Sequence, residues 1–394
     1  MALADLPISG REYPGLEPFD RMMLSLMNKW SIPGGALAVS RDGHVLLTRG
    51  YGYADLERRI PVVPENLFRV ASLTKPITSV AIMKLIERGS VRLDQQVLPN
   101  LGTAAPPQFK IVDPRIASIT VGELLHHTGG FDTDRSGDPM FMPRADEVAR
   151  LAGGRMPASK YDIIRGALQQ NLDFDPGSRY AYSNFGYNML GRVIEQLSGM
   201  PYEEFVQKNV LAPAGVSMWE GRTLEPHAQE VHYYDYPGSH VVNPEPGLAT
   251  GKVPAPYGQF YLEAMDSHGG WIASVPEYLR FWLATFGEGD RPLLTPRMLA
   301  IMRVRPANLP RNQPKYYGCG IQVRVIGNGR FNYWHTGSLP GTMTIAVHSD
   351  EGFDWVAAFN SRPKESDEFM GQVDNGLWEA CRDVREWPQG DLWR

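Results

Sequence analysis

The sequence predicts an α/β protein of the α+β type, in which one antiparallel sheet is built from both ends of the chain and flanked by helices. Short apolar runs separated by turn residues occur at 35–48 and again at 320–359. The region between them has helical spacing instead. At 394 residues the chain is long for one simple core, so we expect a second, mainly helical domain inserted into the first.

Strands are predicted first near the N-terminus. An apolar run at 35–40 and a second at 44–48 flank the turn signal Arg41-Asp42-Gly43, which predicts a hairpin. Further strands are expected near the C-terminus, at 320–326, 331–334, 342–347 and 355–359. A helix is expected after them at 365–386, because apolar residues there recur on one face.

Helices dominate the middle of the chain. The run from Ser72 to Arg88 has a broad apolar face and stops at Gly89. Further helices are expected at 121–126, 186–197, 277–286 and 296–302. From this pattern we assign residues 1–95 and 275–394 to the α/β domain, and residues 96–274 to the helical domain.

One long segment, residues 222–262, lacks periodicity and is rich in Pro, Gly, His and Tyr. A loop of that length inside a compact chain usually has a function, so we expect a wall or lid of a site here. Aromatic walls suit an apolar acyl or alcohol group. Among the nearby aromatic residues we single out Trp271 as a substrate-binding residue, because it follows Gly269-Gly270; packing between the domains is the alternative.

Composition narrows the class of protein. A net charge of -5 and a pI near 6.0 argue against a nucleic-acid partner. No run of about 18 apolar residues occurs, so no membrane span is expected. The N-terminus has no basic start and no apolar core of a signal peptide, which favours a cytoplasmic protein unless a leader has been removed. The two cysteines, Cys319 and Cys381, are interpreted as packing residues, and no zinc motif occurs.

The sharpest chemical signal is Ser72-Leu-Thr-Lys75. Residues three apart share a face of a helix, so the Lys75 amine can reach the Ser72 hydroxyl. A serine hydroxyl is a weak nucleophile until a base takes its proton, and a lysine whose pKa is lowered by burial is such a base. The alternative is a helix cap with a solvated lysine one turn later. The motif also occurs at Ser361-Arg-Pro-Lys364, which we interpret as a loop.

A second element is Tyr182-Ser-Asn184, which precedes the helix expected from Gly186. Beside a lysine ammonium the Tyr182 phenolate is favoured, so this side chain is a candidate general base. Asn184 is a candidate to hold Lys75 or a substrate amide. The alternative is a helix-entry turn with a packed tyrosine.

A third element, His335-Thr-Gly-Ser338, lies between two expected strands. Gly337 allows a substrate to approach the strand edge closely. The backbone N–H groups of Ser338 and Ser72 are candidates for an oxyanion hole, and His335 is a candidate to orient the substrate. The same three letters occur at His127-Thr-Gly129, which we interpret as a capping turn.

Together, in the order Ser-x-x-Lys, Tyr-x-Asn and x-Thr-Gly, these motifs resemble those of the serine β-lactamase and penicillin-binding protein superfamily. The resemblance covers roughly residues 20–385. It is strongest to the branch that contains class C β-lactamases, D,D-carboxypeptidases, D-aminopeptidases and family VIII carboxylesterases. Supporting stretches are 68–72, 124–130 and Pro176-Gly177.

The resemblance implies a β-lactamase-like fold with the site in a cleft between the domains. It implies that Ser72 is acylated, that Lys75 and Tyr182 handle its proton, and that the amides of Ser72 and Ser338 hold the oxyanion. Water then releases the acid. No metal or organic cofactor is implied.

The third motif departs from the β-lactamase pattern, because His335 stands where those enzymes usually have lysine. A neutral histidine is a poor cation for a substrate carboxylate near pH 7. We therefore favour a carboxylesterase that acts on small, short-acyl esters. A D,D-peptidase, a D-aminopeptidase, a β-lactamase or an acyltransferase that uses the same acyl-enzyme stays open, as does a sensor that keeps the acyl group. The sequence does not decide the oligomeric state.

Overall fold

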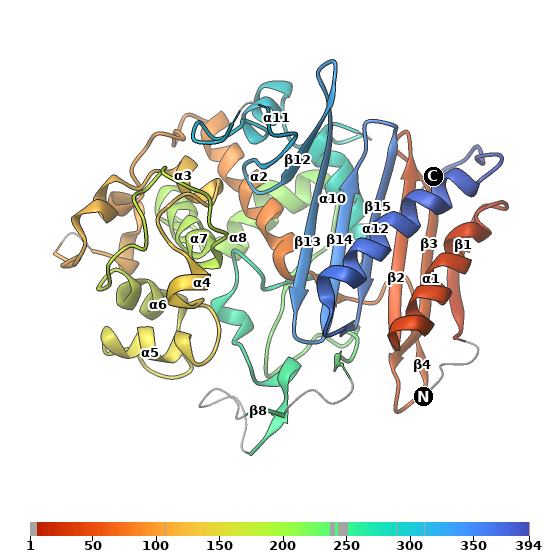
Figure 1. The fold of residues 1–394 in the computed structure, drawn as a ribbon, viewed down its shortest axis with the longest axis horizontal. Helices are drawn as coiled ribbons and strands as arrows, with labels where there is room; N and C mark the ends of the chain where they lie inside the picture. The colour runs from red at the N-terminus through yellow and green to blue at the C-terminus, as the bar shows by residue number, and fades with distance from the viewer. Residues whose placement is uncertain are drawn as a thin grey trace.

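One nine-stranded antiparallel sheet organises the fold (Figure 1). The computed structural model describes residues 6–106, 108–236, 241–242, 251–288, 290–310 and 312–393. In spatial order the strands are β1 (Ile8–Glu12), β3 (His44–Asp55), β2 (Gly34–Arg41), β15 (Phe353–Phe359), β14 (Thr342–His348), β13 (Arg330–Leu339), β12 (Gln322–Gly327) and β11 (Lys315–Tyr317), with β4 (Ile60–Pro61) paired to β3.

The two ends of the chain meet inside this sheet, which confirms the predicted fold class. Figure 1 shows the red N-terminal strands beside the blue C-terminal ones, and the junction is the pairing of β2 with β15, where Ala38 lies opposite Val356. The predicted hairpin is β2 and β3. Asp42 and Gly43 at its tip both have positive φ angles, 51° and 77°, as a two-residue hairpin turn requires.

Helices cover both faces of the sheet. The helices α1 (Glu17–Trp30) and α12 (Ser366–Asp383) pack against each other on one face, and α10 (Val275–Phe286) covers the other (Figure 1). Alternate strand residues therefore enter different cores: Leu37 packs with α1 and α12, whereas Ala38 belongs to the core that includes α10.

The remaining helices form a mainly helical region at the other end of the molecule (Figure 1). They are α2 (Thr74–Glu87), α3 (Val121–Leu125), α4 (Thr133–Ser136), α5 (Arg144–Leu151), α6 (Lys160–Ala167), α7 (Asn184–Ser198), α8 (Tyr202–Val206) and α9 (Ala212–Ala214), with α11 (Pro296–Met302) against α2. The α2 helix is buried nearly all round and contacts α7 and α8, so it forms the centre of this region. The domain boundaries that we assigned from the sequence stay a prediction.

A small sheet lies behind the start of α2. Its strands are β5 (Phe68–Arg69), β10 (Trp271–Ala273) and β6 (Trp219–Glu220). In the described part of the loop predicted at 222–262, β7 (Tyr234–Asp235) pairs with β16 (Ser361–Arg362), β8 (Val241–Val242) pairs with β9 (Val253–Pro254), and two 3₁₀ helices follow at Ala255–Tyr257 and Leu262–Ala264. Residues 237–240 and 243–250 of this loop lie outside the described residues.

The structure also bears on the two cysteines and on membrane-spanning helices. Cys319 and Cys381 are both buried and unpaired, in agreement with a packing role. None of the helices in the described ranges combines the length and the apolar character needed to cross a bilayer.

Candidate active site

Ser72 is presented on a strained turn directly before α2. It lies in a short 3₁₀ helix, η1 (Ala71–Leu73), rather than in the first turn of the α-helix as predicted. Ala71 has a φ of 50°, a conformation that costs a residue with a side chain on the order of 1 kcal/mol. Val70 holds the turn in place, because its N–H donates to the Trp271 carbonyl at 2.9 Å and its carbonyl accepts from Thr344 Oγ1 at 2.9 Å. The turn leaves Ser72 only half-buried, so a substrate can reach it.

Lys75 is fully buried among neutral acceptors. Its Nζ donates to Ser72 Oγ at 3.0 Å, to Asn184 Oδ1 at 2.7 Å and to the His268 carbonyl at 3.0 Å. Burial lowers the pKa of Lys75 to about 7, although the charge of Asp138 acts in the opposite direction. Near neutral pH much of Lys75 is therefore an uncharged amine within reach of the Ser72 proton, which is what a general base requires.

Tyr182 flanks the same pair from the segment before α7. The Ser72 side chain lies close enough to lower the pKa of Tyr182, and the Lys75 amine lies 4.7 Å from the centre of the Tyr182 ring. Burial raises the pKa of Tyr182 well above its usual value near 10, so the side chain is a neutral phenol at physiological pH. This differs from the phenolate expected from the sequence. The cause is desolvation of the Tyr182 side chain.

Asn184 connects Lys75 to a carboxylate that the sequence reasoning missed. The Asn184 amide accepts from Lys75 through Oδ1 and donates through Nδ2 to Asp138 Oδ2 at 2.6 Å. The other oxygen of Asp138 accepts the backbone N–H of Met140 at 2.9 Å. Asp138 lies in the loop after α4, where no motif marks it, so no sequence signal pointed to it.

His127 is a second residue that the sequence reasoning undervalued. It was expected to form only a capping turn after α3, but its buried ring lies 4.3 Å from the ring of Tyr182 and 4.4 Å from that of Tyr317, measured between centres. Its Nδ1 accepts the N–H of Ser183 at 3.1 Å. His127 therefore supports the segment that carries Tyr182. Burial, followed by the charge of Lys75, lowers the pKa of His127 well below its usual value.

His335 on β13 is held as a neutral ring. Its Nδ1 lies 2.7 Å from the Thr336 carbonyl, so this nitrogen carries the proton, and Nε2 accepts from the Tyr317 hydroxyl at 2.8 Å. Burial, with a contribution from Lys75, lowers the pKa of His335 to about 3. At neutral pH this side chain carries no positive charge for a substrate carboxylate.

Gly337 allows β13 to lie against the turn that carries Ser72. A Cβ at this position would come within 2.4 Å of the Val70 carbonyl oxygen and 3.1 Å of Ala71 Cβ, so a larger residue would push the strand away. In the described chain β12 pairs with β13 only as far as Trp334, which leaves the edge at 335–339 without a partner on that side. Ser338 is exposed and lies three positions after the buried His335, so the two side chains are on opposite faces of β13. That the backbone N–H of Ser338 donates to the oxyanion stays a prediction.

Trp271 is not a substrate wall, in contrast to the expectation from the sequence. It lies in β10 with no exposed surface, and its backbone N–H donates to Thr74 Oγ1 at 3.3 Å. Gly270 admits the backbone rather than a ligand, because a Cβ there would come within 2.8 Å of the Leu262 carbonyl oxygen, whereas a Cβ at Gly269 would have nothing nearer than Ala71 at 4.0 Å. Trp271 therefore packs behind the Ser72 turn and supports it.

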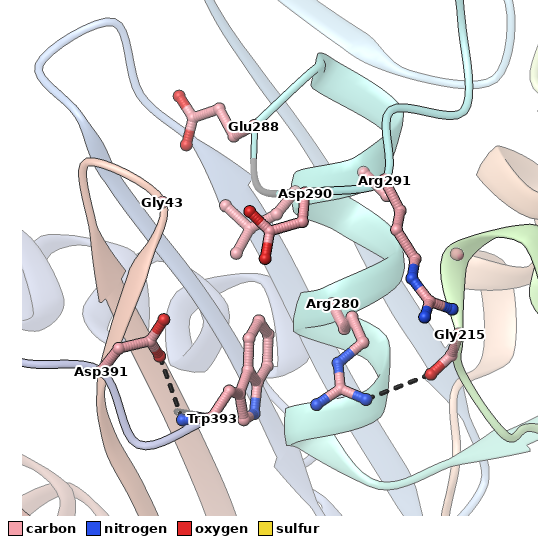
Figure 2. Close-up of a pocket in the computed structure, with 11 residues that line it drawn as sticks. Gly43, Gly215, Arg280, Glu288, Asp290, Arg291, Asp391 and Trp393 are labelled. Atoms are coloured by element: carbon pink, nitrogen blue, oxygen red, sulfur yellow. Dashed lines mark hydrogen bonds between the residues drawn. The ribbon is translucent and has the colours of Figure 1, made fainter.

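A separate pocket of about 300 Å³ lies away from this cluster, between α10 and the C-terminal end of the chain (Figure 2). Arg280 lines it, stacks on the ring of Trp393 at 4.5 Å and donates to the Gly215 carbonyl at 3.1 Å. Its rim also includes Glu288, which with His348 and Asp354 forms one of two groups of side chains, in the described residues, whose donor atoms are close enough to hold a metal. The other group is Asp55, Glu57 and His232. Neither group includes Ser72, Lys75 or Tyr182.

Comparison with known proteins places the chain in a family. The Beta-lactamase family model matches residues 19–373. The chain is 24% identical over 258 residues to Protein flp of Staphylococcus aureus strain N315, which covers 65% of this chain and 48% of that protein. It is 27% identical over 332 residues to a D-aminopeptidase of Gluconobacter oxydans, which covers 83% of this chain and 56% of that protein. The chain thus spans only about half the length of these relatives.

A solved structure shows the same fold. EstCE1, described as a hydrolase with promiscuous acyltransferase activity, superposes with a TM-score of 0.71 over 92% of this chain and 98% of its own, at 20% identity. At that identity the likeness concerns the fold alone.

Proposed function

This chain belongs to the β-lactamase family, and from that premise we propose that it is a serine carboxylesterase that hydrolyses small, short-acyl esters through a Ser72 acyl-enzyme. The contact that carries the proposal is the 3.0 Å hydrogen bond between Lys75 Nζ and Ser72 Oγ, in a place where burial holds the pKa of the lysine near 7. A neutral amine at this position is a base for the serine proton.

In the acylation step, Ser72 Oγ attacks the ester carbonyl while its proton passes to the neutral Lys75 amine. The carbonyl oxygen becomes negative, and the candidate donors for it are the N–H groups of Ser72 and Ser338. When the tetrahedral intermediate collapses, the C–O bond to the alcohol breaks. The alcohol oxygen then takes a proton from the Lys75 ammonium, either directly or through the neighbouring Tyr182 hydroxyl.

Deacylation reverses this sequence with water in place of the alcohol. A water molecule attacks the acyl carbonyl, its proton passes to Lys75, and the bond between the acyl carbon and Ser72 Oγ breaks. Ser72 recovers its proton and the carboxylic acid leaves. An alcohol that takes the place of the water gives acyl transfer instead of hydrolysis.

The choice of an ester with no carboxylate near the scissile bond depends on His335. A β-lactam or a peptide with a free C-terminus carries a carboxylate, which a fixed cation binds favourably. His335 has both ring nitrogens hydrogen-bonded and a pKa of about 3, so it does not supply that cation. Because the Gluconobacter oxydans relative is a D-aminopeptidase, cleavage of an amide is the second candidate.

The test is the turnover of p-nitrophenyl butyrate and of a chromogenic cephalosporin by the wild type and by Ser72→Ala. We expect ester cleavage that needs Ser72 and a much slower reaction with the cephalosporin. The matched control is Ser361→Ala, which removes the serine of the second Ser-x-x-Lys sequence and should keep full activity. Ester cleavage that survives in Ser72→Ala contradicts the assignment, and faster cephalosporin turnover replaces the esterase with a β-lactamase.

A further inference from the structure

A chain of hydrogen bonds leads from the nucleophile to a carboxylate outside the three motifs. Ser72 Oγ is bonded to Lys75 Nζ at 3.0 Å, Lys75 Nζ to Asn184 Oδ1 at 2.7 Å, and Asn184 Nδ2 to Asp138 Oδ2 at 2.6 Å. Each link joins a donor to an acceptor, so the order of the atoms is fixed. In particular, the Asn184 amide can donate to Asp138 only with its Nδ2 turned that way, which turns its Oδ1 toward Lys75.

Asp138 is itself held rigidly. Its Oδ1 accepts the Met140 N–H at 2.9 Å, and its carbonyl accepts the Phe141 N–H at 3.2 Å, so the loop after α4 folds back around the carboxylate. Both carboxylate oxygens have a donor, although burial raises the pKa of Asp138 above its usual value. The short loop therefore presents one fixed acceptor to the amide of Asn184.

The other titratable groups around Lys75 do not replace this carboxylate. The side chains that face it are His127 from the turn after α3, Tyr182 and Tyr187 beside and on α7, His268 before β10 and His335 on β13. Burial lowers the pKa of all three histidines and raises that of both tyrosines, so these groups are uncharged near pH 7. The charge that acts on the pKa of Lys75 is therefore that of the Asp138 carboxylate.

From this geometry we propose that Asp138 is a positioning residue, which acts through the Asn184 amide to aim the Lys75 amine at Ser72 and to tune its protonation. The proposal rests on the proposed function, since it gives Asp138 a role in the same serine activation. It assigns two separable effects to one side chain. The hydrogen bond orients the amide, and the negative charge favours the ammonium form of Lys75.

Two variants separate these effects. Asp138→Asn keeps an oxygen for Asn184 Nδ2 but removes the charge. The pKa of Lys75 should then fall, and the acidic limb of the pH profile of kcat/KM should move to lower pH by up to about one unit. Asp138→Ala removes both the bond and the charge, so kcat should also fall about ten- to a hundredfold, because the amine is no longer held in place. Asp134→Asn, on α4 with an exposed side chain, is the matched control and should change neither quantity.

The readout should not depend on the ester proposal. The rate at which a fluorophosphonate labels Ser72, followed by mass spectrometry as a function of pH, reports serine activation whatever the natural substrate is, and Ser72→Ala gives the blank. Labelling of the wild type without ester turnover would overturn the esterase but leave the role of Asp138 measurable. A wild type that is not labelled would overturn both.

The proposal for Asp138 has its own decisive result. If Asp138→Asn is folded by circular dichroism and its acidic limb coincides with that of the wild type, the charge has no part in tuning Lys75. If Asp138→Ala also keeps the wild-type labelling rate, the positioning role is wrong. Should Asp138→Ala fail to fold, the acidic limb of the pH profile of kcat/KM of Asp138→Asn alone decides the proposal.

Discussion

Two lysines in this protein, one buried and one half-buried, have pKa values shifted in opposite directions. Lys75 donates only to neutral oxygens, and burial lowers its pKa to about 7. Lys160 on α6 has a side chain that is 22% exposed, and it lies 2.5 Å from the carboxylate of Asp266. Burial acts to lower the pKa of Lys160 as well, but the charge of Asp266, its hydrogen bond to Lys160 and the charge of Glu220 together raise the pKa above the usual value. A carboxylate partner keeps Lys160 a fixed cation, whereas Lys75, buried among neutral oxygens, becomes a base.

The Lys160 region is built to hold charge. Asp266 has no exposed side-chain surface and also accepts from Arg192 at 2.5 Å. Burial acts to raise the pKa of Asp266, but Arg192 and Lys160 lower it to about 2. Two residues further along the chain, the His268 carbonyl accepts from Lys75. The ion-paired region therefore anchors the backbone that the reactive region uses.

The largest expected effect follows from removing the two lysines in turn. Lys75→Met should lower kcat/KM on the order of 10³-fold, because the base for Ser72 is lost. Lys160→Met should leave kcat/KM within a few-fold of the wild type, since Asp266 keeps Arg192. Steady-state kinetics with p-nitrophenyl butyrate measures both. Equal losses of kcat/KM in the two variants would contradict the assignment of Lys75 as the base and Lys160 as an ion-paired cation.

The second effect concerns stability. Asp266→Asn leaves Arg192 and Lys160 without their shared carboxylate, and breaking a buried ion pair from one side costs about 3–5 kcal/mol. The free energy of unfolding from urea titration should fall by that amount, against no change in Asp134→Asn. A loss below about 1 kcal/mol would mean that water reaches the cluster and screens it.

The smallest effect is a pH dependence that belongs to Lys75 alone. Its pKa is about 7 in the folded protein, below its usual value of 10.5. Between these two values the unfolded chain binds the extra proton, so this group makes the free energy of unfolding rise with pH by about 1.4 kcal/mol per unit. Below pH 7 its penalty on folding is present in full. Lys75→Met should lack this rise when the two proteins are unfolded in urea at pH 7.5 and 9, and identical slopes would contradict the lowered pKa.

Much of the fold was predictable from local patterns. The hairpin of β2 and β3, the strands near the C-terminus and the helices α10, α11 and α12 follow from apolar periodicity and turn residues, which act over a few neighbouring positions. The start of α2 was not predicted correctly, because the positive φ of Ala71 is imposed by Val70 being held between β10 and β14. Trp271 was misjudged for a related reason: neighbouring glycines indicate a close approach but not what approaches.

The sequence by itself determined the order of the motifs, the candidate nucleophile and the alternation of the strands, since these depend on residue type and spacing. Only the tertiary structure decided the protonation states. Tyr182 is a neutral phenol, His335 a neutral ring and Lys75 a partly uncharged amine because each is withdrawn from water by segments distant in the chain. Asp138 joined the site for the same reason: desolvation and hydrogen bonding depend on which groups the fold brings within a few ångströms of one another.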